Sequence, residues 1–276
     1  MKKIRIRLKV FSLFIPIAFL MSCRTTGKIQ AVDSNDHDKL IMSVAWFQNS
    51  AEMTALYYQG FNIAKLRIDE ALAANSKGSS LAVVVDIDET MLDNSPFEST
   101  LIRDEDNLQG WYDWTKKASA RALPGALEFA KYAESRQVDI FYITNRDDKE
   151  RQVTLLNLLN AGFPYATEDH LLTKSDLSYT TGNTSSKAER RFKVSEKYEI
   201  CLLIGDNLND FSELFEDRSN NNGKDAVKNN YLQFGLKFIV LPNPMYGAWE
   251  KPLYDYKEGL SNKEKTMLLK SKLRSE

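Results

Sequence analysis

Four short apolar runs, separated for the most part by stretches with helical patterning, constrain the fold of this chain more than any other feature. The runs span residues 81–85, 138–143, 200–204 and 237–241. Short runs of this kind are typical of strands that are buried on both faces of a sheet. Because strands and helices alternate along the chain, the sequence predicts an α/β fold, a parallel sheet flanked by helices.

Helical patterning is clearest between residues 39 and 75. The string Asn49-Ser50-Ala51-Glu52 resembles a capping box, and one apolar stripe follows it at three- and four-residue spacing. The stripe, which we interpret as core, consists of Tyr57, Phe61, Ala64, Ile68 and Ala71. Further along the chain, residues 124 and 125 are expected to open a helix, and Asp147 or Asp148 to cap another that ends near residue 162.

The N-terminus is typical of an export signal. Five basic residues within residues 2–9 precede an apolar stretch, residues 10–21, that is short for a bilayer span. The string Leu20-Met21-Ser22-Cys23 resembles the lipobox of bacterial lipoproteins, in which the cysteine is lipidated; the alternative is an apolar helix with an incidental cysteine. Once Cys23 carries lipid, Cys201 is the remaining thiol and no internal disulfide can form. Cys201 lies in an apolar run, so we expect it to be an inert core residue.

These patterns divide the chain into five parts. We expect a signal peptide (1–22), a lipidated tether (23–38), an N-terminal helical segment (39–78), the main α/β domain (79–255) and a C-terminal helical tail (256–276). The stretch from about residue 95 to 122 interrupts the alternation of strands and helices and contains three aromatic residues, Trp111, Tyr112 and Trp114. It is therefore a candidate cap over the sheet edge.

Charge and histidine content exclude some functions. The formal net charge of -1 gives no long-range field to recruit nucleic acid, so no nucleic-acid partner is expected. The two histidines do not lie in a pattern typical of a metal site or a catalytic pair, which disfavours a histidine nucleophile.

Polar residues follow the predicted strands, at the edge where parallel sheets bind ligands. Asp86 and Asp88 follow the first run, and two such carboxylates can divide nucleophilic attack or metal binding from proton transfer. Asp-x-Asp also occurs in many turns.

The string Thr144-Asn145-Arg146 follows the second run and offers a hydroxyl, backbone N–H groups and a cation to a phosphate. Taken alone, it is equally typical of a capped helix start.

Two further groups complete the set. Lys187 lies at the expected start of a helix, where it is either a solvated side chain or a phosphate-binding cation. Asp206 and Asp210 follow the third run, and their oxygens can bind a hard cation, although a capped turn has the same residues. Because all four groups follow a buried strand or begin a helix, the sequence predicts that they form one site.

The order Asp86-x-Asp88, Thr144, Lys187, Asp206 with Asp210 resembles the four motifs of the haloacid dehalogenase (HAD) superfamily. The strings 84–95 (VVDIDETMLDNS) and 205–211 (GDNLNDF) resemble its class C acid phosphatases, also called DDDD phosphatases. Many of these are outer-membrane lipoproteins of the lipoprotein e family with 5'-nucleotidase activity. The resemblance runs from about residue 46 to 250 and implies a HAD-like Rossmannoid sheet with a smaller helical cap domain.

The resemblance also implies roles. Asp86 would attack phosphorus and form an aspartyl phosphate, and Asp88 would protonate the leaving alcohol and then activate water. Mg²⁺ would be held by Asp86, the backbone carbonyl of Asp88, Asp206 and Asp210. Lys187 would add positive charge. Thr144 and the backbone of Asn145 would orient phosphate oxygens.

The resemblance further suggests a substrate, a nucleoside 5'-monophosphate whose base lies between Trp114 and Tyr246; alternatively, both rings pack under the cap. Trp111 is interpreted as structural. The expected partners are a small phosphomonoester and, through lipid on Cys23, the outer membrane of a bacterial cell envelope; a homodimer is compatible with the sequence. Two rival functions stay open: a non-catalytic surface lipoprotein that captures haem or a nucleotide, and a phosphotransferase on the same fold.

Overall fold

The computed structural model describes residues 38–103, 110–176 and 185–275, which belong to one compact unit, residues 35–276. The expected signal peptide, Cys23 and nearly all of the tether lie outside the described residues. In the described ranges, no helix is both long and apolar enough to cross a bilayer.

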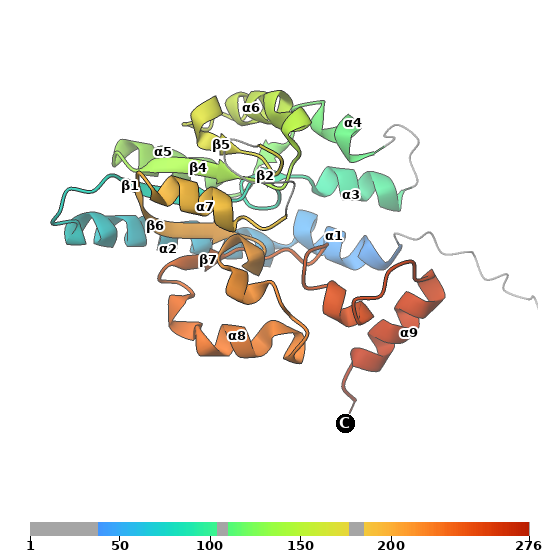
Figure 1. Cartoon of the computed structure of the whole chain (residues 1–276). Helices are drawn as coiled ribbons and strands as arrows, with labels where there is room; N and C mark the ends of the chain where they lie inside the picture. Colours follow the sequence, from blue (N-terminus) through green and yellow to red (C-terminus); the bar gives the residue numbers. More distant parts are fainter. Residues whose placement is uncertain (1–37, 104–109, 177–184, 276) are drawn as a thin grey trace, which may run out of the picture. The chain divides into compact units, whose positions relative to one another are not determined.

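A five-stranded parallel sheet forms the centre of this unit, with strand order β5-β4-β1-β6-β7 (Figure 1). All four strands predicted from the apolar runs are present, which confirms the predicted α/β fold. The additional edge strand, β5, has only two residues, too few to show a pattern in the sequence. The strands are β1 (Leu81–Val85), β4 (Asp139–Ile143), β5 (Leu171–Leu172), β6 (Glu199–Gly205) and β7 (Phe238–Val240).

Helices cover both faces of the sheet. In β1, Val83 and Val85 face a core that also contains Tyr57 and Phe129, whereas Val84 faces a second core that contains Phe215. Because successive strand residues point to opposite faces, an all-apolar strand requires a core on each side. The α-helices are α1 (Ile41–Asn49), α2 (Ala51–Ala74), α3 (Ser95–Ile102), α4 (Trp111–Thr115), α5 (Ala126–Ser135), α6 (Arg151–Asn160), α7 (Ala188–Ser195), α8 (Lys224–Asn229) and α9 (Asn262–Lys272).

The N-terminal helical region consists of two helices that meet at Ser50. The Ser50 side chain accepts a hydrogen bond from Met53 N at 3.1 Å and caps α2. The cap thus lies one residue later than in the expected box of Asn49 and Glu52, because Asn49 Nδ2 donates to the Ala45 carbonyl at 3.0 Å instead. Tyr57, Phe61, Ala64 and Ile68 of the predicted stripe are buried on α2, and Ala71 packs against the same core. Tyr57 also donates a hydrogen bond to the Glu89 carbonyl, so α2 supports the loop that follows β1.

A short two-stranded sheet frames the predicted cap segment. Strand β2 (Leu92–Asp93) pairs antiparallel with β3 (Arg121–Ala122). The two ends of the segment between these strands therefore lie side by side, and the segment forms an excursion from the main domain. Helices α3 and α4 lie in that excursion (Figure 1). The segment thus lies next to the loop after β1, which carries the first two aspartates.

Candidate active site

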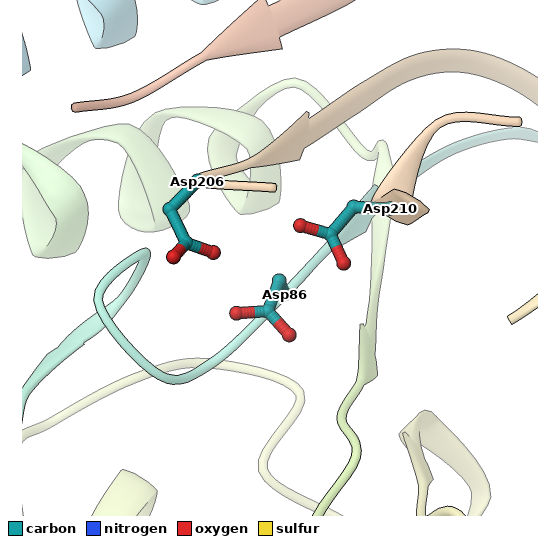
Figure 2. A group of neighbouring side chains, drawn as sticks. All are labelled: Asp86, Asp206 and Asp210. Atoms are coloured by element: carbon teal, nitrogen blue, oxygen red, sulfur yellow. The ribbon is translucent and has the colours of Figure 1, made fainter. Parts of the chain in front are cut away.

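Three carboxylates converge at the carboxyl edge of the sheet. Asp86 follows β1, Asp206 follows β6, and Asp210 ends the 3-10 helix η4 (Leu208–Asp210). One oxygen of each lies within 4.8 Å of the others, and Figure 2 shows the three side chains turned toward one another. Three of the four aspartates predicted for the metal site are therefore brought together by the fold.

The loop after β6 fixes Asp210. Asp210 Oδ2 accepts a hydrogen bond from Asn207 N at 3.0 Å, which closes a capping box. A Cβ atom at position 205 would lie 2.7 Å from the Asp210 Cβ and Cγ atoms, so only glycine fits at the end of β6. On the other side of the cluster, Asp206 Oδ2 accepts a hydrogen bond from Asn243 Nδ2 at 2.8 Å.

Lys187 supplies the positive charge inside the cluster. It is the residue before the first turn of α7, it is buried, and its Nζ contacts Asp86 Oδ1 and, at 2.7 Å, Asp210 Oδ1. Burial disfavours the ammonium, but Asp210 and Asp86 outweigh it and raise the pKa of Lys187 above its usual value. Lys187 is therefore a charged member of the site.

The carboxylates still outnumber that cation. Burial, together with the charges of Asp210 and Asp88, raises the pKa of Asp86 to about 7 despite Lys187, which lowers it. Burial, followed by the charges of Asp86 and Asp210, raises the pKa of Asp206 well above its usual value. Three oxygen donors with unbalanced negative charge fit a hard divalent cation, which would offset the repulsion. The residues present therefore suit Mg²⁺ or a cation like it.

Asp88 is held differently from the other three aspartates. Its Oδ1 accepts hydrogen bonds from Arg146 Nη2 at 2.7 Å and from Asn94 Nδ2 at 2.8 Å. Its Oδ2 has longer contacts, with Arg146 Nε at 3.2 Å and Thr144 Oγ1 at 3.3 Å. These contacts hold the Asp88 side chain apart from the carboxylate cluster and leave Oδ2 the more weakly engaged oxygen.

Thr144 and Asn145, which were both expected to orient phosphate, lie differently with respect to the cavity. Thr144 is fully buried and lies outside the cavity lining; its hydroxyl contacts Asp88 and accepts a hydrogen bond from Arg146 N at 3.1 Å. It therefore positions Asp88 and Arg146. Asn145 does line the cavity, and its Oδ1 accepts a hydrogen bond from Arg190 Nη2 at 2.9 Å.

Arg190 joins two of the predicted motifs. This fully buried guanidinium donates to the Thr144 carbonyl, to Asn145 and, at 2.9 Å, to the Ser186 carbonyl beside Lys187. Burial lowers the pKa of Arg190 to about 10, so it stays charged at neutral pH. In the sequence it is one of several basic residues on a helix, and nothing there distinguishes it.

The carboxylates open into a cavity of about 510 Å³. Tyr246 lines it as expected, but the structure places Trp111 in the lining instead of Trp114. The Trp114 indole N–H donates to Asn94 Oδ1 at 2.8 Å and its ring packs against the core. The Trp111 ring lies 5.5 Å from the Arg146 guanidinium carbon and 5.4 Å from the Phe97 ring.

Several cavity and support residues were not predicted. Arg146 was named only as a cation near phosphate, and Asn243 lies after the last strand, where the strand-edge rule could have identified it. Glu98 and Lys251 also line the cavity, from α3 and from the 3-10 helix η8 (Lys251–Tyr254). They have no motif that would have revealed them.

Comparison with known proteins agrees with this geometry. The family model for the HAD superfamily, subfamily IIIB (acid phosphatase), matches residues 21–249. The class C acid phosphatase of Bacillus anthracis is 40% identical, with a TM-score of 0.79 over 87% of this chain and 99% of that one. A structure of that enzyme with tungstate bound gives a TM-score of 0.78 at the same identity, over 87% of this chain and 98% of that one.

A plant protein is also similar. Acid phosphatase 1 of Solanum lycopersicum is 28% identical over 166 residues, which are 59% of this chain and 57% of the tomato protein. The family model covers most of the chain, and the structural neighbours are similar over nearly their full length. The chain belongs to the HAD superfamily, subfamily IIIB, a family of phosphoric monoester hydrolases of the acid phosphatase type, which confirms the resemblance found in the sequence.

Proposed function

We propose that this chain is an acid phosphatase that hydrolyses nucleoside 5'-monophosphates through an aspartyl phosphate on Asp86. The observation that carries the proposal is the position of Asp86, which lies in the cavity wall in contact with Lys187 and beside Asp206 and Asp210. The tungstate that binds the Bacillus anthracis enzyme is a tetrahedral oxyanion, as phosphate is, which supports a phosphate site in a chain of this family.

The carboxylates Asp86, Asp206 and Asp210 would hold Mg²⁺, and the family pattern adds the Asp88 carbonyl. The cation would supply positive charge that offsets the repulsion between a carboxylate and a phosphate dianion. Lys187 lies between Asp86 and Asp210 and reduces that repulsion from the protein side. Asn145, at the cavity wall, would orient phosphate oxygens through its backbone N–H.

In the first half-reaction an Asp86 oxygen forms a bond to phosphorus, and the bond from phosphorus to the leaving alcohol breaks. A proton from Asp88 goes to the alcohol oxygen. In the second half-reaction water attacks phosphorus, its proton returns to Asp88, and the Asp86–phosphorus bond breaks. Arg146, Asn94 and Thr144 hold the Asp88 carboxyl in one orientation throughout.

Trp111 and Tyr246 line the cavity and are the aromatic rings that we propose bind the base. Stacking on a base contributes about 1–3 kcal/mol and tolerates different bases. Trp114, which we expected in this role, is engaged with Asn94 and the core instead.

Attachment to the outer membrane through lipid on Cys23 remains part of the proposal, on the strength of the basic segment and the lipobox-like string. Labelling cells with a palmitate analogue, with Cys23→Ala as the control, would test it. Lack of label on the wild-type protein would contradict the lipid anchor.

The proposed function is tested with a panel of nucleoside 5'-monophosphates and nitrophenyl phosphate, with added Mg²⁺ and with chelator. We expect release of inorganic phosphate that stops with chelator and returns with Mg²⁺. Binding of nucleotides without phosphate release would contradict hydrolysis, and phosphate recovered on an added alcohol would identify a phosphotransferase.

A further inference from the structure

Glu98 is distinctive among the carboxyl groups of the cavity. Of the buried carboxyl groups in the lining, Asp86 and Asp210 contact Lys187, and Glu150 accepts a hydrogen bond from Thr115 Oγ1 at 2.9 Å. Glu98 is only 9% exposed, yet its carboxyl group has no hydrogen-bond or ion-pair partner among the described residues. Its oxygens are not among the fully enclosed atoms without a partner, so they remain open to solvent, and a carboxyl group in the cavity wall with free acceptor oxygens is a candidate ligand contact.

The surroundings of Glu98 place it near the proposed base-binding rings. It follows Phe97, whose ring meets Trp111 edge to face, and it lines the cavity together with Trp111 and Tyr246. Helix α3, which carries Glu98, lies in the excursion between β2 and β3, whereas the metal-binding carboxylates follow β1 and β6. Glu98 therefore belongs to the part of the cavity that is built from outside the central sheet.

The charge around Glu98 indicates what kind of group it can bind. Burial and the nearby Glu250 raise the pKa of Glu98 to about 7, and Lys251, Arg146 and Glu150 line the same cavity. Both the protonated and the ionised carboxyl group are therefore accessible near neutral pH. Each form has an oxygen that accepts a hydrogen bond from a hydroxyl or amino group.

We infer that Glu98 is a specificity-determining residue, whose carboxyl group accepts a hydrogen bond from a hydroxyl or amino group on the leaving alcohol of the substrate. This inference rests on the proposed function, since it assumes that phosphomonoesters are cleaved in the cavity. For a nucleotide, the donor is either a sugar hydroxyl or an amino group of the base. In either case Glu98 gains the partner that it lacks in the protein alone.

The test compares Glu98→Ala with the wild type on four substrates: AMP, 2',3'-dideoxy-AMP, purine riboside 5'-monophosphate and nitrophenyl phosphate. We expect kcat/KM for AMP to fall about tenfold, with a much smaller loss for nitrophenyl phosphate. The loss in kcat/KM caused by Glu98→Ala should also be smaller on one of the two nucleotide analogues than on AMP. A smaller loss on 2',3'-dideoxy-AMP, which lacks the sugar hydroxyls, identifies a sugar hydroxyl as the donor. A smaller loss on purine riboside 5'-monophosphate, which lacks the amino group, identifies the amino group of the base.

Two further variants separate recognition from folding. Glu98→Gln keeps the shape and one acceptor oxygen, so it should fold and lose less activity on AMP than Glu98→Ala does. Thr100→Ala, on the same helix, has its hydroxyl bound to the Pro96 carbonyl and should change no substrate preference.

Equal losses on AMP and nitrophenyl phosphate, or no loss on AMP, would overturn the inference. So would a loss on AMP that persists in full on both analogues, because no hydrogen bond would then be responsible. A wild-type protein that cleaves nitrophenyl phosphate but shows no preference among the three nucleotides would overturn it as well. If the wild type cleaves neither nucleotides nor nitrophenyl phosphate, the proposed function itself fails.

Discussion

Two groups of residues that line the cavity come from different parts of the fold. In the first group, Asp86 and Asp206 directly follow strands of the central sheet and Asp210 ends the 3-10 helix η4 after β6, and each contacts Lys187 or a neighbouring polar group. In the second group, Glu98 and Trp111 come from the excursion between β2 and β3, and Tyr246 from the chain after β7. The sheet thus fixes the groups proposed for chemistry, and added segments supply those proposed for substrate choice.

This difference predicts that substitutions in the first group reduce activity on every substrate, whereas substitutions in the second group change the preference among substrates. The largest effect is expected for Asp86→Asn, because an amide is a poor nucleophile. The loss in kcat should be on the order of 10⁴-fold or more on both AMP and nitrophenyl phosphate. Steady-state kinetics would measure it, with the exposed Asp225→Asn on α8 as the control.

Near wild-type turnover by a folded Asp86→Asn variant would remove Asp86 from the chemistry. A thermal melt verifies the fold in the same preparation. Lys187 keeps Asp210 as a partner in this variant, so we expect the fold to survive.

A smaller effect is expected for Asp206→Asn, which removes one anionic oxygen from the proposed cation site. Affinity for Mg²⁺ should fall about 10- to 100-fold, and raised Mg²⁺ should recover part of the rate on all substrates. Calorimetric titration would measure the affinity. Unchanged affinity would show that Asp206 does not bind the cation.

In the second group, Trp111→Ala and Tyr246→Ala should each reduce kcat/KM on nucleotides about tenfold through loss of a stacking partner, which corresponds to about 1–2 kcal/mol of transition-state stabilisation. Nitrophenyl phosphate should lose much less. Trp114→Phe is the matched comparison, because it removes the hydrogen bond to Asn94 but keeps an aromatic ring in the core. A nucleotide-specific loss in Trp114→Phe alone would restore Trp114 as the base-binding ring.

The smallest effect concerns stability and pH. The pKa of Glu98 is raised to about 7 by burial and by Glu250, so the folded protein retains a proton that the unfolded chain releases. This proton therefore contributes to the free energy of unfolding: the contribution is fully present below about pH 4.5 and is lost as the pH rises through 7.

Replacing the carboxyl group with an amide in Glu98→Gln removes this dependence. The variant should gain on the order of 1 kcal/mol over the wild type at pH 8, and much less at pH 5. Denaturant melts at the two pH values would measure the difference. A gain of equal size at both values would show that the charge of Glu98 does not affect folding.

The difference between sheet residues and residues of the added segments also explains which parts of the site the sequence could predict. Buried parallel strands appear as apolar runs, and the residues that follow them must meet at one edge, so the sequence alone could group Asp86, Asp206 and Asp210. No comparable rule applies to α4, a helix of five residues that is too short to show a periodic face. The sequence therefore could not indicate that Trp111, and not Trp114, lines the cavity.

The sequence also could not predict roles that depend on tertiary contacts between side chains. Arg190 reaches Thr144 and Asn145 across 45 or 46 positions of the sequence, and Glu98 is notable only for the partner it lacks. Neither property is visible in a single sequence, because each depends on which side chains the fold leaves beside it.

If Asp86 carries phosphate during turnover, the phosphorylated protein should be trapped in the Asp88→Asn variant. This variant cannot shuttle the proton, so nitrophenyl phosphate, whose leaving group needs little protonation, should still phosphorylate Asp86 while hydrolysis stalls. Because the variant leaves the buried Arg146 without its carboxylate partner, a thermal melt must first verify that it is folded.

Rapid acid quench followed by mass spectrometry of the peptides then locates the phosphate. We expect an acid-stable, base-labile adduct on Asp86 in Asp88→Asn and none in Asp86→Asn. Phosphate on any other residue, or turnover by Asp88→Asn at the wild-type rate with no adduct, would contradict it.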